Sequence, residues 1–197
     1  QIALSVRVLV EELKALGAEP FIVPGMGSHG GATAEGQARV LADLGVTEGS
    51  AGCPILSSMD VVELGALPNG LPVYMDRLAM GADGIVVVNR IKPHTAFSGS
   101  IESGLVKMIT IGLGKQKGAD SCHAFGFGHM ERNMIEMAKV KLARAPFLFG
   151  VGTVENAYDR VAKIVAVPAE EFIDAEPRLL VEARENMPSI PFDPLDV

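Results

Sequence analysis

The sequence predicts an α/β fold with a largely parallel sheet that has helices on both faces, plus a small β-hairpin. Apolar runs of strand length alternate along the chain with stretches of helical periodicity, which favours a parallel sheet. The run at 84–89 is apolar on both faces, as is typical of a central parallel strand. Proline, asparagine and glycine at 68–70 separate two short strand patterns and indicate a hairpin turn.

The first quarter of the chain is predicted as helix, strand and helix. Apolar residues recur at gaps of three and four over 1–17, which predicts an amphipathic helix closed by a glycine. A short buried strand is expected at 20–23, followed by a glycine loop at 25–31. Thr33 is predicted to cap the next helix, which we expect to run to Leu44.

The rest of the chain is predicted as strands and helices that alternate up to residue 186. We expect the helix that begins at Pro168 to be broken into two pieces at Pro177. The predicted elements are hairpin strands at 61–65 and 71–75, a helix at 76–81, strands at 84–89, 146–152 and 161–167, and helices at 128–145 and 168–186. We interpret 1–186 as one domain whose natural start lies upstream of Gln1. The proline-rich segment 187–197 is interpreted as a linker to a further domain.

Composition and charge exclude several classes of protein. The chain is 48% hydrophobic but has no apolar run of membrane-spanning length and no signal-peptide pattern. A net charge of −7 argues against a nucleic-acid surface, because neutralising phosphates requires clustered Lys and Arg. The two cysteines are too few for a disulfide framework or a cysteine metal cage. We therefore expect a cytoplasmic protein with a small-molecule ligand.

The stretch 91–123 is the main candidate for function. It follows the buried strand at 84–89, reads as a loop rich in glycine and small polar residues, and contains two histidines and four lysines. Open α/β sheets place their ligands at such strand ends. His29 stands in a similar glycine loop, and we expect the loops of His29 and His94 to face one another. Both imidazoles can transfer a proton near pH 7, although each could instead merely brace its loop.

Three further side chains could bind a ligand. Lys107 has apolar neighbours on both sides, so partial burial would lower its pKa and make it nucleophilic, unless it simply extends from a helix end to solvent. Lys115 and Lys117 lie between glycines and could contact a phosphate, but the spacing is not that of a nucleoside-triphosphate loop. His123 could be a metal ligand, although its neighbours do not form a known chelate spacing.

These motifs carry a resemblance to a known family. Gly27-Ser-His29 before a Thr/Glu helix, Ile91-Lys-Pro-His94 before a Phe-Ser-Gly turn, Lys107 and His123 occur in this order. Over about 18–190, the chain resembles the N-terminal domain of the nickel-dependent lactate racemases. Such enzymes interconvert the enantiomers of 2-hydroxy acids by hydride transfer to and from a nickel pincer nucleotide, which is tethered through a thioamide to a lysine.

The resemblance implies a role for each candidate. Lys107 would be the tether, His123 the protein ligand to nickel, and His29 and His94 the acid/base pair that flanks the substrate. The interval between His94 and Lys107 is longer than in the family, which leaves Lys115 as an alternative tether. The substrate would be a small 2-hydroxy acid, and the glycines after His29 suggest one other than lactate. The segment that holds the substrate carboxylate and the C-terminal domain that closes the site are expected outside this sequence.

Two alternatives remain open at this point. The chain could be a module that binds a nucleotide or another anion on its glycine loops without catalysis. It could also be a zinc hydrolase with His29, His94 and His123 as ligands, which requires three distant loops to meet within about 2.1 Å of one ion.

Overall fold

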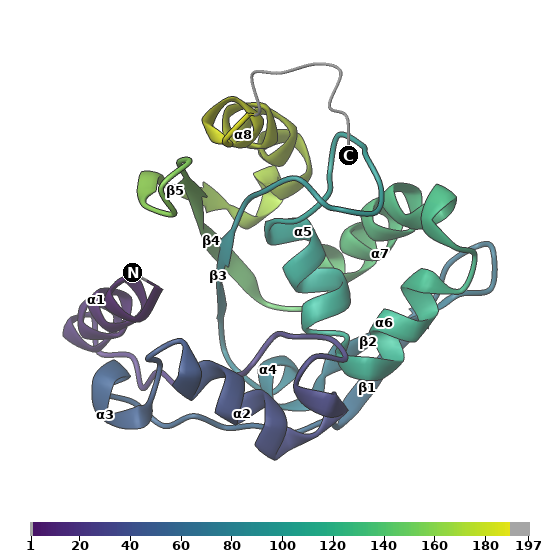
Figure 1. Cartoon of the computed structure of the whole chain (residues 1–197). Helices are drawn as coiled ribbons and strands as arrows, with labels where there is room; N and C mark the ends of the chain where they lie inside the picture. Colours follow the sequence, from purple (N-terminus) through teal and green to yellow (C-terminus); the bar gives the residue numbers. More distant parts are fainter. Residues whose placement is uncertain (1, 190–197) are drawn as a thin grey trace.

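A small three-stranded sheet lies at the centre of the protein (Figure 1). The computed structural model describes residues 2–189. Strand β3 (Ile85–Arg90) pairs in parallel with β4 (Phe147–Glu155), which pairs in the antiparallel sense with β5 (Val161–Pro168). The α/β class is confirmed, but the prediction of a largely parallel sheet is wrong. The connection between β4 and β5 is a short turn, and only an antiparallel pair can be joined in this way.

The predicted hairpin forms a second sheet. Strand β1 (Val61–Ala66) pairs with β2 (Pro72–Asp76) in the antiparallel sense, with an irregularity between Glu63 and Gly65. The short helix α4 (Arg77–Met80) follows directly and connects this hairpin to β3. The expectations for this part of the chain are therefore confirmed.

The N-terminal part is mostly helical. It contains α1 (Ile2–Ala15), the 3-10 turn η1 (Gly30–Ala32), α2 (Ala34–Asp43) and α3 (Glu48–Ala51). Thr33 caps α2 as predicted, because its hydroxyl accepts a hydrogen bond of 3.0 Å from Gly36 N. The strand predicted at 20–23 is reduced to one parallel bridge between Ile22 and Ile55.

The stretch predicted as a glycine-rich loop is helical from Leu105 onwards. A continuous helix is made of α5 (Leu105–Lys107) and the π-helical turn η2 (Met108–Gly112), and α6 (Lys115–His123) follows it. The prediction of a loop holds only for the part before Leu105. Apolar side chains within the helix are completely buried, including those of Val106 and Ile109, and this burial favours helix in spite of the flanking glycines.

The remaining helices pack around that segment. A 3-10 turn η3 (Phe127–His129) leads into α7 (Met130–Arg144), and η4 (Ala169–Glu171) leads into α8 (Phe172–Asn186). Helix α5 contacts α7, α8, β3 and β4, so it lies in the middle of the core (Figure 1). The methionine stripe of α7 packs in the core, since Met130, Met134 and Met137 are at most 1% exposed.

Helix α8 is not broken at Pro177, contrary to the prediction. The proline lies within the helix and removes one backbone donor. Phe172, Leu179 and Leu180 are buried on either side of it, and their packing holds the helix together across that gap. Most of the predicted linker, 190–197, lies outside the described residues, so the domain boundary at 186 stays a prediction. Within 2–189, no helix has the length and apolar character needed to cross a membrane.

Candidate functional site

Lys107 lies at the end of α5, and its side chain is half-buried beneath the loop that follows β3. Within the described part of the chain its ammonium has neither a hydrogen bond nor an ion pair, which is unusual for a lysine that has lost part of its hydration. Burial lowers the pKa of this amine, and the charge of Lys92 lowers it further. The structure therefore provides an amine that is more nucleophilic than a surface lysine.

His94 stands in the loop 91–104, near enough to Lys107 for the charge of that amine to act on its imidazole. Its ring packs against Phe97 at 4.5 Å between centroids, and its Nδ1 accepts a hydrogen bond of 3.1 Å from Ala96 N. Burial lowers the pKa of His94, and the charge of Lys107 adds to this effect. The imidazole is therefore neutral at pH 7.

His123 completes a group with His94 and Lys107. It is the last residue of α6, is exposed, and has the edge of the Phe127 ring beside it at 6.4 Å between centroids. Its charge, like that of Lys107, acts on His94. The structure thus brings together three of the side chains that the sequence singled out, from three separate elements.

Glu102 organises the loop that holds His94, and no pattern in the sequence pointed to it. Its carboxylate is 1% exposed and accepts hydrogen bonds from His94 N at 2.7 Å, from Gly99 N at 2.8 Å and from Arg184 at 2.5 Å. Arg184 belongs to α8 and also donates to Gly99 O at 3.0 Å. The unusually long interval between His94 and Lys107 therefore contains the residue that fixes the backbone at His94.

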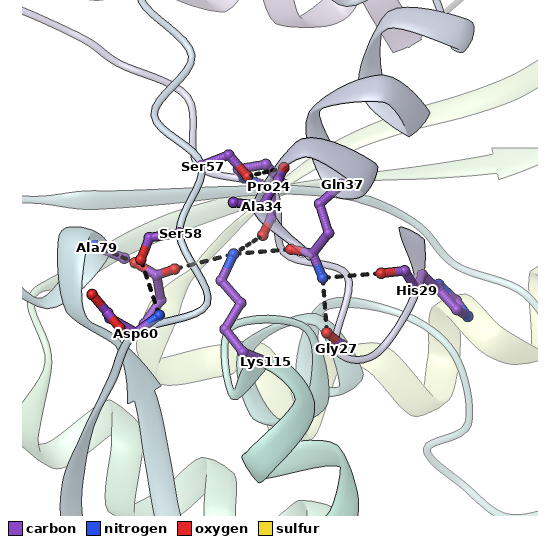
Figure 2. Close-up of polar contacts among 11 residues, drawn as sticks. Pro24, Gly27, His29, Ala34, Gln37, Ser57, Ser58, Asp60, Ala79 and Lys115 are labelled. Atoms are coloured by element: carbon purple, nitrogen blue, oxygen red, sulfur yellow. Dashed lines mark hydrogen bonds and ion pairs between the residues drawn. The ribbon is translucent and has the colours of Figure 1, made fainter. Parts of the chain in front are cut away.

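His29 lies in a second loop, which packs against the segment that follows Lys107. Gly27 N donates to Gly112 O at 3.0 Å, and the amide nitrogen of Gln37 donates to Gly27 O and His29 O at 2.8 and 3.3 Å. Gly27 has φ +59°, and a Cβ there would lie 3.1 Å from Ile111, so glycine suits this approach. Only the backbone of His29 takes part in these bonds, and its side chain is exposed (Figure 2). It makes no contact with His94 among the described residues.

Lys115 is completely buried beneath this second loop. Its ammonium donates to Pro24 O at 2.5 Å and to Gln37 Oε1 at 3.1 Å, and forms an ion pair with Asp76 Oδ2 at 3.1 Å (Figure 2). These three acceptors match the three hydrogens of an ammonium group. The sequence analysis missed both Gln37 and Asp76, because each is a polar residue inside an otherwise ordinary helix or strand end.

Lys117 points elsewhere. Its side chain is exposed, with the amine 5.8 Å from the centre of the Tyr74 ring. Neither Lys117 nor Lys115 is among the charges that act on His94 or Lys107. Of the four lysines in 91–123, Lys92 and Lys107 therefore lie near His94, whereas Lys115 and Lys117 do not.

The described residues contain no group of three or more His, Cys, Asp or Glu side chains that could hold a metal ion between them. Cys122, next to His123, is completely buried, and burial raises the pKa of its thiol to about 12. A metal at this site would therefore need most of its donors from a bound group.

Comparison with known proteins gives a consistent picture. The model of the Lactate racemase N-terminal domain family matches residues 2–134. The structure of the lactate racemase apoprotein from Thermoanaerobacterium thermosaccharolyticum is similar, with a TM-score of 0.67 and 19% sequence identity. The similarity covers 90% of this chain and 45% of that one, so the chain spans less than half of that protein's length. No curated protein matches the sequence.

Proposed function

This chain belongs to the lactate racemase N-terminal domain family, and on that basis we propose that it is the cofactor-binding part of a racemase or epimerase of a small 2-hydroxy acid. The observation that carries the proposal is the convergence of His94, Lys107 and His123, which come from a loop and two helices. An unpaired, half-buried amine near the imidazole of His94 suits covalent attachment of a cofactor better than it suits fold stability.

The residues present fit a nickel pincer nucleotide. A cofactor that brings its own sulfur donors needs one imidazole from the protein and one amine for the tether. His123 and Lys107 provide these, and we propose them as the nickel ligand and the tether. Lys115, the alternative tether, makes two hydrogen bonds and an ion pair and has no exposed surface. When bound, the cofactor supplies an acceptor for the hydrogen that leaves the substrate carbon with its electron pair.

His94 is proposed to exchange the hydroxyl proton of one enantiomer. Its lowered pKa keeps the ring neutral and able to accept a proton near pH 7. Because Nδ1 accepts a hydrogen bond from Ala96 N, the neutral ring carries its hydrogen on Nε2. Proton uptake then occurs at Nδ1, and the bond to Ala96 must open for it.

His29 is proposed to serve the other enantiomer. A racemase needs a proton acceptor on each side of the reacting carbon, and His29 comes from a different loop that packs on the same helix as Lys107. Its exposed side chain leaves it free to meet a substrate.

A non-catalytic anion-binding module is the second candidate. It is favoured by Lys92 and Lys107, two neighbouring cations that have no carboxylate partner in the described part of the chain. The variants His29→Asn and His94→Asn separate the two functions. A racemase loses interconversion of its substrate and keeps its cofactor, whereas a binding module keeps its affinity and has no turnover to lose. The zinc hydrolase alternative needs three converging ligands, which the described residues do not provide.

The decisive experiment is peptide mass spectrometry of the full-length protein, produced in a host shown to make the nickel pincer nucleotide, with nickel measured on the same sample. We expect a nucleotide-sized adduct on the Lys107 peptide together with bound nickel. Lys107→Arg should lose both, and Lys117→Arg, which changes an exposed lysine nearby, should keep both. An unmodified Lys107 without nickel would overturn the proposal, and an adduct on the Lys115 peptide would move the tether.

A further inference from the structure

The helix that carries Lys107 begins at a carboxylate supplied by another helix. Glu176 of α8 is 1% exposed, and its Oε2 accepts a hydrogen bond of 2.7 Å from Val106 N. The residue at the cap position is Gly104, which has no side chain to offer. A Cβ at that position would lie 2.6 Å from the carboxyl of Glu176, so glycine allows the carboxylate to approach the free N–H groups of the first turn.

The same helix ends at a buried ammonium. In the π-helical turn, Leu113 N donates to Met108 O five residues earlier, at 2.8 Å. Lys141 of α7, which is 1% exposed, donates to Ile109 O at 2.8 Å and to Thr110 O at 2.9 Å. Lys141 thus satisfies carbonyl groups that the widened turn leaves without a helical donor.

The two groups have the arrangement that a helix dipole favours, with an acid at the N-terminus and a base at the C-terminus. Burial raises the pKa of Glu176 to about 7 and lowers the pKa of Lys141 to about 7, so each is only partly charged at neutral pH, and a neutral Lys141 amine still donates to both carbonyls. Neither has an ion-pair partner among residues 2–189, and one oxygen of Glu176 has no hydrogen-bond donor at all. Burial of ionisable groups without a countercharge is costly, so the fold alone gives little reason for charged residues at these positions.

We propose that Glu176 and Lys141 are positioning residues that clamp the helix of Lys107 at both ends and thereby hold its amine in place. Lys107 lies between the two clamped ends, one residue after Val106 and two before Ile109. The inference rests on the proposed function, because it concerns the residue proposed as the tether. Neither clamp requires a bound cofactor, so the geometry can be tested without one.

The test measures how fast Lys107 reacts with an amine-acylating reagent as the pH is raised, in the full-length protein purified without nickel. Peptide mass spectrometry compares Lys107 with the exposed Lys139 in the same digest. In the unmodified protein, the midpoint pH for Lys107 lies below that for Lys139. In Glu176→Ala and in Lys141→Met, we expect this midpoint to rise towards that of Lys139. The plateau rate should increase about fivefold or more, as for the loss of one helix cap.

Matched variants decide whether the clamp is specific. Glu176→Gln keeps an oxygen that can accept from Val106 N, and it should restore most of the original midpoint. Glu185→Gln on α8 and Arg132→Met on α7 change exposed residues of the same helices, keep Lys139 as the reference, and should leave Lys107 as it was. An unchanged midpoint and plateau in folded Glu176→Ala and Lys141→Met would overturn the proposal.

Amide hydrogen exchange of the unmutated protein covers the case in which the variants do not fold. We expect Leu105 and Val106, in the first turn of the Lys107 helix, to exchange at least about tenfold more slowly than the first turn of α1. Equal rates would mean that Glu176 does not cap the helix. If acylation and exchange support the clamp but Lys107 takes up no cofactor, only the proposed function is contradicted. If Lys107 carries the adduct but the variants leave its reactivity unchanged, only the clamp is contradicted.

Discussion

Lys107 and Lys115 are separated by two helical turns, yet their surroundings are opposite. Lys115 is completely buried and is met by a carboxylate, an amide oxygen and a backbone carbonyl. Its backbone has φ +55°, a conformation that costs free energy in any residue except glycine. Lys107 is half-buried in a regular helix and has no partner in the described part of the chain.

The difference shows how to separate a structural lysine from a reactive one. The Lys115 ammonium makes two hydrogen bonds and an ion pair, so it connects the loop of His29, helix α2 and the end of β2. At Lys107 the polar contacts are made by the backbone around the residue, and the amine has none among the described residues. Burial without partners favours a functional role for Lys107, which the proposed function assigns to it.

The largest expected effect is on stability. Lys115→Met should lower the free energy of unfolding by about 3–5 kcal/mol, because it leaves the buried carboxylate of Asp76 unpaired. Lys107→Met should change it by less than about 1 kcal/mol, since no contact of the ammonium is lost. Denaturant unfolding followed by circular dichroism measures both.

The double variant Lys115→Met/Asp76→Asn serves as the control. It removes the unpaired charge while an amide oxygen still accepts the hydrogen bond from Ala79 N, which Asp76 accepts at 2.8 Å. It should therefore recover part of the lost stability. If Lys107→Met lowered the free energy of unfolding as much as Lys115→Met, the distinction between the two lysines would be wrong.

A third lysine, Lys141, extends the comparison to the pH dependence of stability. Burial lowers the pKa of Lys141 from 10.5 to about 7. Between pH 7 and 10.5 the unfolded chain therefore binds a proton that the folded protein does not, and stability rises with pH in this window. The slope is about 1.4 kcal/mol per pH unit, and it vanishes below pH 7, where both states are protonated.

Lys141→Met should remove this slope, although it also leaves the carbonyls of Ile109 and Thr110 without their donor. Urea unfolding at pH 7, 8 and 9 gives the slope for each protein, and Lys139→Met corrects for the other titrating groups. The same slope in both variants would mean that Lys141 keeps its charge in the folded protein.

The smallest expected effect is a change in the pKa of His94. The charge of Lys107 lowers the pKa of His94, so Lys107→Met should raise that pKa towards its usual value. Lys117→Met should leave it unchanged, because Lys117 is not among the charges that act on His94. NMR titration of the His94 ring in the protein without nickel measures both. A fall in the pKa in Lys107→Met would show that the two groups are arranged differently.

Local patterns in the sequence were sufficient for most of the helices and strands. The cap at Thr33 and the hairpin depend on neighbouring residues, and both were predicted. The glycines that flank Leu105 suggested a loop, because the burial that stabilises this helix comes from segments far away in the chain. The sheet was predicted as largely parallel because strand order and direction depend on connections that a pattern of apolar runs does not show.

Only part of the candidate site could be predicted from the sequence. His29, His94, Lys107 and His123 have chemistry that stands out in glycine-rich surroundings, and their roles remain predictions. Glu102, Glu176, Lys141 and Arg184 could not be selected, because each is one charged residue among many in a helix or loop. Glu102, Glu176 and Lys141 are buried, and partners of these four residues lie up to 85 residues away, so that only the folded chain brings them together.

The long-range contacts of α8 also determine when the site can form during translation. Glu176 meets Val106 across 70 residues of chain, and Arg184 meets Glu102 across 82. A growing chain leaves the ribosome N-terminus first, so Lys107 and the loop of His94 emerge well before the helix that contacts their surroundings. The proposed site is therefore complete only once α8 has been synthesised and has docked, and a cofactor that requires the clamped lysine is attached after translation of this region.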